Sequence, residues 1–392
     1  MIKKNFLHIL FGLTTAIIIF NFYFFVKELS LNQYADWLIN YQGGFVRRGF
    51  IGEIFYQIHS LFFVRLDYLV FLSVSIFYIF FYKNFLKIIE NFKYNLINLL
   101  IIFSPMSFIY PVMEEKASGR KDILFLLFLS IAAINLKKLP FDRQKYLIII
   151  LSAILVFSHT GFLFLLPALL IVFLFSNKNQ NFKKILKEIF YILLSYIFFL
   201  IIILNNTSIG PESIQLICNS ISDYIRHDCS KTGYISTLDW SLKYNLSLKK
   251  EIWMTENYNF FYLFAFFFSF LPILFAFSNS KFLNYKKINV LFFFSIFLVL
   301  TLPLYYLGVD YGRYMHLSYI SLIIMLSVGL KNKVISFTFP KNSIFLNLKL
   351  KSSLLFVLIF LYGFTFTIPH CCNNELKFNY SKIISAINLK LN

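Results

Sequence analysis

Apolar runs of about 20 residues recur along the whole chain, and no other feature constrains its fold as strongly. A helix of about 20 residues crosses the hydrocarbon core of a bilayer and satisfies its own backbone hydrogen bonds there. Only 14% of the residues are charged, whereas a soluble domain has about a quarter. The sequence therefore excludes a soluble enzyme, a disordered chain and a fibrous protein. It predicts an all-α, polytopic helical membrane protein.

The first predicted span runs from about residue 6 to 26 and follows Lys3 and Lys4. The run lacks the cleavage site of a signal peptide, so we expect a retained transmembrane helix with its basic end in the cytoplasm. Hydropathy places the further spans at residues 61–82, 95–113, 122–136, 189–204, 258–277, 288–305, 317–330 and 352–368.

The stretch from 146 to 175 has two interpretations: one long tilted helix, or two short halves broken at His159-Thr160-Gly161. The choice inverts the sidedness of every later segment. With the break, the loops 178–187, 278–287 and 331–351 are cytoplasmic and hold 4, 3 and 5 basic residues. The opposing segments 205–257, 306–316 and 369–392 hold 5, 1 and 3, although together they are more than twice as long. Cytoplasmic loops are rich in Lys and Arg, so this density favours the hairpin.

The resulting topology has about 11 membrane segments, two of them short, with the N-terminus inside and the C-terminus outside. Residues 1–392 are then a single integral membrane domain. Its outer segments are the loops 27–60, 114–121, 205–257 and 306–316 and the tail 369–392.

All four cysteines fall on the outer side in this topology. Cys218 and Cys229 are expected either as a disulfide or as two thiols, and no bond is expected between the adjacent Cys371 and Cys372. The sequence has no P-loop, no GxGxxG and no metal-ligand cluster of convincing spacing, so we expect no metal and no other cofactor.

The net charge of +19 divides unequally between the two sides. The predicted inner side holds 21 basic and 3 acidic residues, and the outer side holds 16 and 15. The charge therefore reports orientation in the membrane, and it argues against a nucleic-acid partner. Six of the seven arginines nevertheless lie outside, where they serve no anchoring role: Arg47, Arg48, Arg65, Arg120, Arg226 and Arg313. Because arginine binds phosphate and carboxylate bidentately, this excess indicates recognition of an anion at the outer face.

The first candidate motif is the segment 41–53, which has four glycines in ten positions around Arg47 and Arg48. Glycine permits close approach of a ligand to the backbone. Asp36 and Glu53 flank the segment. We interpret it as a cradle for a lipid-linked pyrophosphate; a loop that binds lipid headgroups is the alternative.

The second motif is Gly119-Arg120-Lys121, at the start of a predicted helix. A helix N-terminus already attracts anions, and the two cations strengthen such a site. A solvated turn with internal ion pairs is the alternative.

The third motif is the segment 310–316, in which Asp310 and Arg313 are three residues apart. Tyr311 and Tyr314 are expected to stack on sugar rings. An Asp–Arg pair that caps the helix is the alternative.

His159 is the fourth candidate, because a titratable residue at a broken helix within an apolar run indicates function. Its ordinary pKa suits proton transfer near neutral pH. The alternative is a histidine hydrogen-bonded to a backbone carbonyl freed by the break.

These motifs resemble the Wzy-type O-antigen or capsule repeat-unit polymerases of bacterial polysaccharide clusters. The resemblance covers residues 30–330 and rests on Phe45-Val-Arg-Arg-Gly, Gly119-Arg-Lys-Asp, the mid-chain His159 and Asp310-Tyr-Gly-Arg. It implies a C-type membrane glycosyltransferase architecture in the bacterial cytoplasmic (inner) membrane, with the active site facing the periplasm or exterior. A lipid-linked glycan is the implied substrate, with membrane lipids and a chain-length regulator as partners.

The resemblance implies that Arg47, Arg48 and Arg120 bind the donor pyrophosphate. His159, Asp36 or Glu53 is then the base, and Asp310 and Arg313 position the acceptor. Two other functions stay open: a glycosyltransferase that adds one sugar from a polyprenyl-monophosphate donor, and a lipid-linked glycan flippase.

Overall fold

A computed structural model describes residues 4–90, 92, 96–206, 209–226, 228–255, 258–283, 289–338, 352–371 and 377–378. Six of the described helices are long and apolar enough to cross a membrane: α1 (Lys4–Lys27), α3 (Leu66–Ile89), α9 (Phe182–Leu204), α13 (Tyr258–Ser278), α14 (Val290–Leu307) and α15 (Tyr311–Lys331). The prediction of an all-α polytopic membrane protein is confirmed at this level.

The chain divides into two compact units. Unit 1 comprises Met1–Thr14, Leu86–Ala117 and Lys249–Asn392, and unit 2 comprises Thr15–Phe85 and Ser118–Leu248.

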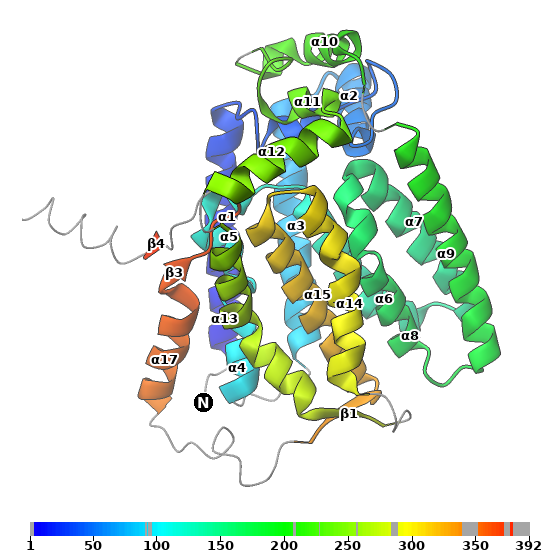
Figure 1. The fold of residues 1–392 in the computed structure, drawn as a ribbon, viewed down its shortest axis with the longest axis vertical. Coiled ribbons are helices and arrows are strands. Elements are labelled where there is room, and N and C mark those ends of the chain that lie inside the picture. The colour runs from blue at the N-terminus through cyan, green and yellow to red at the C-terminus, as the bar shows by residue number, and fades with distance from the viewer. Residues whose placement is uncertain are drawn as a thin grey trace, which may run out of the picture. The chain divides into compact units, whose positions relative to one another are not determined.

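Unit 1 is built around α15. In its apolar 18-residue segment 83% of the residues are buried, against 50% for α13 and 28% for α14. Figure 1 shows α13, α14 and α15 side by side, and each of the three contacts the other two. Ser318, Ser321 and Ser327 lie buried along α15, and such small residues let neighbouring helices approach closely. The other elements of unit 1 are α4 (Leu96–Ile102), α5 (Tyr110–Met113), η2 (Glu115–Ala117), β1 (Ser280–Phe282), β2 (Ile335–Phe337), α17 (Ser352–Phe364), β3 (Phe366–Thr367) and β4 (Lys377–Phe378).

The two short sheets of unit 1 are antiparallel pairs. Strand β1 pairs with β2 with Lys281 opposite Ser336, and β3 pairs with β4 with Thr367 opposite Lys377. Strand β1 directly follows α13, β2 follows α15, and β3 follows α17.

The span predicted at 95–113 differs from a regular transmembrane helix. Helix α4 ends at Ile102, the chain turns through buried residues 103–109, and α5 adds a single turn. Pro105 explains the break, because proline lacks an N–H group and disfavours helical backbone at the residue before it. Ser104 donates a 3.0 Å hydrogen bond to the carbonyl of Ser269 on α13. Irregular backbone is tolerated at membrane depth when protein surrounds it in this way.

Unit 2 contains the hairpin, not one long helix. Helix α7 (Phe141–Ser158) ends at His159, whose backbone is extended, and the chain returns through η4 (Thr160–Leu165) and α8 (Pro167–Ser176). Asn177, after α8, donates a 2.6 Å hydrogen bond to Gln144, in the first turns of α7. Both ends of the hairpin therefore lie on the same side of unit 2, as the density of basic residues predicts.

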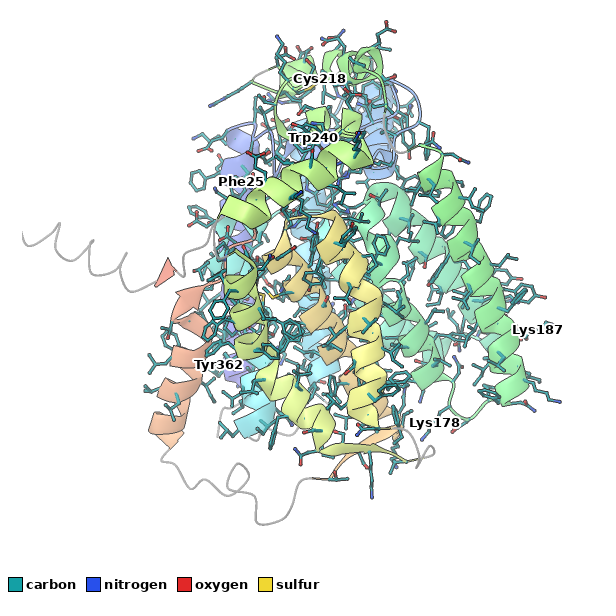
Figure 2. All side chains as sticks on the ribbon, in the orientation of Figure 1. Phe25, Lys178, Lys187, Cys218, Trp240 and Tyr362 are labelled. Carbon is teal, nitrogen blue, oxygen red and sulfur yellow. A yellow bond between two sulfur atoms is a disulfide. The ribbon has the colours of Figure 1, made fainter. Side chains whose placement is uncertain are left out.

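The lysine-rich end of unit 2 lies opposite its cysteines. Figure 2 shows Lys178 and Lys187 near one end of α9 and Cys218 beyond the other end. The remaining elements of unit 2 are η1 (Ala35–Leu38), α2 (Phe50–Phe62), α6 (Asp122–Asn135), η3 (Leu136–Lys138), α10 (Pro211–Ser220), η5 (Ser222–Tyr224), α11 (Gly233–Ser236) and η6 (Thr237–Asp239). Helix α12 (Leu242–Thr255) continues from unit 2 into unit 1.

Cys218 and Cys229 form a disulfide within the long loop, which decides between the two states left open by the sequence. Cys371 is described without a disulfide, and Cys372 lies outside the described residues.

Replacing both Cys218 and Cys229 by serine is expected to destabilise this loop by about 3 kcal/mol, because a disulfide of this span removes that much loop-closure entropy from the unfolded state. Native-state proteolysis of the purified chain measures the effect. Equal cleavage rates with and without the bond would contradict it.

Candidate functional site

Four basic residues lie on two loops that contact each other in unit 2, and we call Arg47, Arg48, Arg120 and Lys121 the basic cluster. Lys121 is fully buried, and its Nζ donates a 2.9 Å hydrogen bond to the carbonyl of Arg48. The same Nζ lies 3.6 Å from Oδ1 of Asp36. The first and second sequence motifs, which are far apart in the chain, therefore form one site.

A glycine sets the position of the second motif. Gly119 has a φ of +71°, which other residues rarely adopt, and a Cβ there would lie 2.1 Å from the ring of Phe22. Its carbonyl accepts a 2.6 Å hydrogen bond from the indole of Trp37, and its N–H donates to the hydroxyl of Tyr78 at 3.2 Å. These bonds fix Arg120 and Lys121, the next two residues, against η1 and α3.

A close backbone contact at a second glycine fixes the position of the first motif. At Gly52 a Cβ would lie 2.0 Å from the carbonyl oxygen of Ile39, so α2 approaches the end of η1 as no larger residue would allow. Glu53 accepts a 2.8 Å hydrogen bond from the N–H of Tyr41 and a 2.6 Å bond from the side chain of Gln57. Burial, and secondarily Glu53, raises the pKa of Tyr41 to about 12. Glu53 thus closes the glycine-rich loop that carries Arg47 and Arg48.

The long loop covers the basic cluster through α11 and η6. The guanidinium of Arg120 lies 4.4 Å from the ring centre of Tyr234, and Arg47 donates a 3.4 Å hydrogen bond to the carbonyl of Thr237. The Nε atoms of Arg47 and Arg48 are buried and have no hydrogen-bond partner among the described residues. Donors in this state are available to an anionic ligand.

The electrostatics of the basic cluster favour an anion. Burial, and secondarily Arg48, lowers the pKa of Arg47 to about 10. Burial lowers the pKa of Lys121 to about 8, against the opposing effect of Asp36. Arg47 and Lys121 therefore carry positive charge at neutral pH. Asp36 forms an ion pair with Lys121, and the arginines of the basic cluster add further positive charge in a poorly solvated place.

The three candidate bases all have structural bonds. Asp36 is 2% exposed and pairs with Lys121, and Glu53 closes its loop. His159 caps η4, since its Nδ1 accepts a 3.2 Å hydrogen bond from the N–H of Gly161. The bond is to a backbone N–H at the break, whereas the structural alternative named a backbone carbonyl. The glycine-rich loop that carries Arg47 and Arg48 also reaches the C-terminal end of α7, where His159 lies. There the rings of Phe45 and Phe157 are 6.0 Å apart.

The third motif belongs to unit 1. Asp310 precedes α15 and forms an ion pair with Arg313 in its first turn, and Arg313 is 3% exposed. Tyr311 packs against the ring of Tyr262 at 5.4 Å, while Tyr314 lies 5.6 Å from Tyr305. The Asp310–Arg313 pair of the structural alternative is present, but the Asp310 side chain makes no cap hydrogen bond to α15. Tyr311 and Tyr314 pack on other tyrosines.

An apolar cavity of about 330 Å³ lies between α13, α14 and α15 next to this motif. Its lining includes Tyr262, Phe266, Leu302, Tyr305, Tyr311 and Met315. A cavity of this size and character suits part of a lipid chain.

Lys249 lies beside the tyrosines of this cavity and was not predicted from the sequence. It is 4% exposed, its Nζ donates to the carbonyls of Tyr305 and Tyr306, and it lies 5.6 Å from the ring centre of Tyr311. Burial lowers its pKa to about 8. Lys249 lies in a polar stretch of the sequence, far from Tyr305 and Tyr306. No sequence pattern therefore indicated that it would be buried beside them.

No family model, curated protein or solved structure matches this chain. The fold and the site define the class of the protein. It is a helical polytopic membrane protein, with a buried basic cluster in unit 2 and an apolar cavity of lipid-chain size in unit 1.

Proposed function

We propose that this protein polymerises polyprenyl-pyrophosphate-linked oligosaccharide repeat units at the outer face of a bacterial cytoplasmic membrane. The proposal includes the topology of about 11 segments, with the N-terminus inside and the C-terminus outside. In that topology the segments carrying both arginine motifs face outward, and the lysine-rich loops face the cytoplasm.

The observation that carries the proposal is the basic cluster, in which two buried arginine Nε donors lack a hydrogen-bond partner within the described part of the chain. A pyrophosphate has the charge and the many acceptor oxygens that such donors require. Free nucleotide substrates are disfavoured, because the cluster belongs to loops that flank apolar helices. A phosphate carried by a membrane lipid fits this setting.

In the proposed reaction an acceptor hydroxyl attacks the anomeric carbon of the donor glycan. The bond between that carbon and the pyrophosphate oxygen breaks, and the polyprenyl pyrophosphate leaves with the negative charge. Arg47, Arg48 and Arg120 stabilise this charge as it develops. The hydroxyl proton passes to Asp36, Glu53 or His159, and Glu53 is the only one of these three that is not classed as buried.

The cavity of unit 1 supports a second lipid carrier. Its apolar walls suit isoprenoid units, and Lys249 and Arg313 supply cations close to Tyr311. We assign this region to the carrier of the acceptor repeat unit, and Asp310 and Arg313 to its positioning.

The principal alternative is a glycosyltransferase that adds one sugar from a polyprenyl monophosphate. A monophosphate needs fewer donors than the four side chains of the basic cluster offer, which favours the pyrophosphate. A flippase is less well supported, because the six described spans carry few charged residues along their length.

Deleting the gene in its host and analysing the surface polysaccharide tests the function. A polymerase predicts loss of the length ladder, with single repeat units accumulating on the outer leaflet. A product of normal length that lacks one sugar would instead identify the single-addition transferase. Lipid-linked repeats trapped on the cytoplasmic leaflet would identify the flippase.

A further inference from the structure

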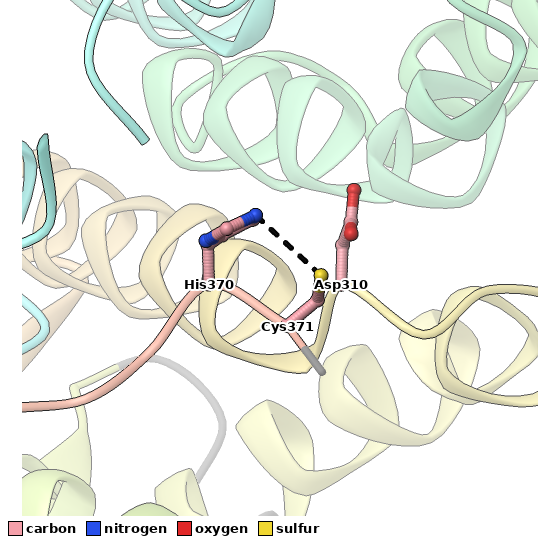
Figure 3. A group of neighbouring side chains, drawn as sticks. All are labelled: Asp310, His370 and Cys371. Atoms are coloured by element: carbon pink, nitrogen blue, oxygen red, sulfur yellow. Dashed lines mark hydrogen bonds between the residues drawn. The ribbon is translucent and has the colours of Figure 1, made fainter. Parts of the chain in front are cut away.

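Three side chains with metal-binding atoms meet in unit 1 at the start of α15. Asp310, His370 and Cys371 each offer one ligand atom, and these atoms all lie within 4.8 Å of one another. Figure 3 shows the three side chains together, with the thiol of Cys371 3.5 Å from Nε2 of His370. Asp310 comes from the turn before α15, and the other two come from the segment after β3.

His370 is held in a fixed orientation. Its Nδ1 is 3.0 Å from Oε1 of Glu114, and its carbonyl accepts a 3.1 Å hydrogen bond from the N–H of Gly312. A Cβ on Gly312 would lie 2.1 Å from the carbonyl oxygen of Pro369, so this backbone approach requires glycine. The contact with Glu114 leaves Nε2 directed towards Cys371.

From this geometry we infer a binding site for a thiophilic divalent cation, Zn²⁺, with Asp310, His370 and Cys371 as ligands. Thiolate, imidazole and carboxylate are the three ligand types that zinc takes in proteins. A carboxylate that orients the second nitrogen of a ligating histidine is the usual outer partner of such sites, and Glu114 occupies that position.

The charges around the site also call for a cation. Arg313 pairs with Asp310, and the Glu114 carboxylate adds negative charge beside His370, in a region where the Glu114 and His370 side chains are only 13% and 12% exposed. Since a carboxylate has two oxygens, Asp310 can bind Arg313 and the cation together.

The cation would join the segment after β3 to the first turn of α15, and so fix the tyrosines beside the apolar cavity. This inference does not rest on the proposed function. The sequence prediction of no metal reflects the distance in sequence between Asp310 and the other two ligands.

Cobalt titration of the full-length chain, purified in detergent and stripped of metal with a chelator, tests the site. We expect one Co²⁺ per chain, a thiolate-to-cobalt charge-transfer band in the near ultraviolet, and displacement of the band by Zn²⁺. The Glu114→Ala variant should weaken Zn²⁺ binding by about 10–100-fold. Metal analysis of the untreated protein gives the native occupancy.

The Cys371→Ser variant should lose the band, and Cys372→Ser, which removes the adjacent thiol, is the matched control and should keep it. Size-exclusion profiles establish that both variants are folded. Absence of the band from the unaltered chain would overturn the inference, and this outcome needs no variant. Persistence of the band in folded Cys371→Ser would overturn it as well.

Discussion

Replacing Arg47 and Arg48 together by alanine is expected to reduce polymer formation about 10²-fold or more. The two buried Nε donors face no acceptor among the described residues, so their loss removes stabilisation of the leaving pyrophosphate. The substitution also removes the hydrogen bond from Arg47 to the carbonyl of Thr237. The length distribution of surface polysaccharide, at equal protein level in a deletion strain, measures the effect.

Two matched variants separate charge from geometry. Lysine at Arg47 keeps the charge but loses the planar fork, so we expect partial activity. Arg226 is an exposed arginine of the long loop outside the basic cluster, and Arg226→Ala should leave the polymer unchanged. A normal length ladder in the double alanine variant would remove the basic cluster from the proposed site.

Several membrane-spanning helices follow closely from hydropathy, because a lipid-facing helix needs only a long apolar run. Helix α3 instead begins five residues after the predicted start at 61, and α9 begins seven residues before the predicted start at 189. The prediction at 258–277 matches α13 to within a residue or two, and the one at 288–305 matches α14. The hairpin at His159 also followed from sequence, since charge density reports on sidedness independently of helix length. The break after Ile102 did not, because the apolar pattern continues past Pro105 into a buried segment of irregular backbone.

The candidate site was predicted as separate pieces. Glycines next to arginines identified both loops of the basic cluster, but the bond from Lys121 to the carbonyl of Arg48 joins residues of loops that lie far apart in the chain. No local sequence pattern predicts a contact between two such distant residues. Lys249 and the pair of His370 and Cys371 were missed for the same reason, since their partners in unit 1 come from α14 and from the turn before α15.

Removing the charge of Lys121 alone should destabilise the protein more than removing the whole ion pair. Lys121→Met leaves the Asp36 carboxylate buried without its cation, and breaking a buried pair in this way costs about 3–5 kcal/mol. In Lys121→Met with Asp36→Asn no buried charge remains, so most of that loss should be recovered. The free energy of unfolding in mixed detergent–SDS micelles measures both variants. A single variant as stable as the unaltered chain would show that the pair is not coupled.

The same lysine should give the protein a pH-dependent stability and an opposite pH dependence of anion binding. Its pKa is about 8 in the folded state against 10.5 when unperturbed, because burial outweighs the attraction of Asp36. Between these two values the unfolded chain binds more protons, so the free energy of unfolding rises with pH, by up to about 3 kcal/mol. Anion binding needs the charged ammonium, and the affinity for inorganic pyrophosphate should therefore fall as the pH rises through 8. Calorimetric titrations of the purified chain at pH 7 and 9 measure this fall, and Lys121→Met with Asp36→Asn should bind more weakly and lose it. An affinity that stays constant over this range in the unaltered chain would show that Lys121 does not contribute to the anion site.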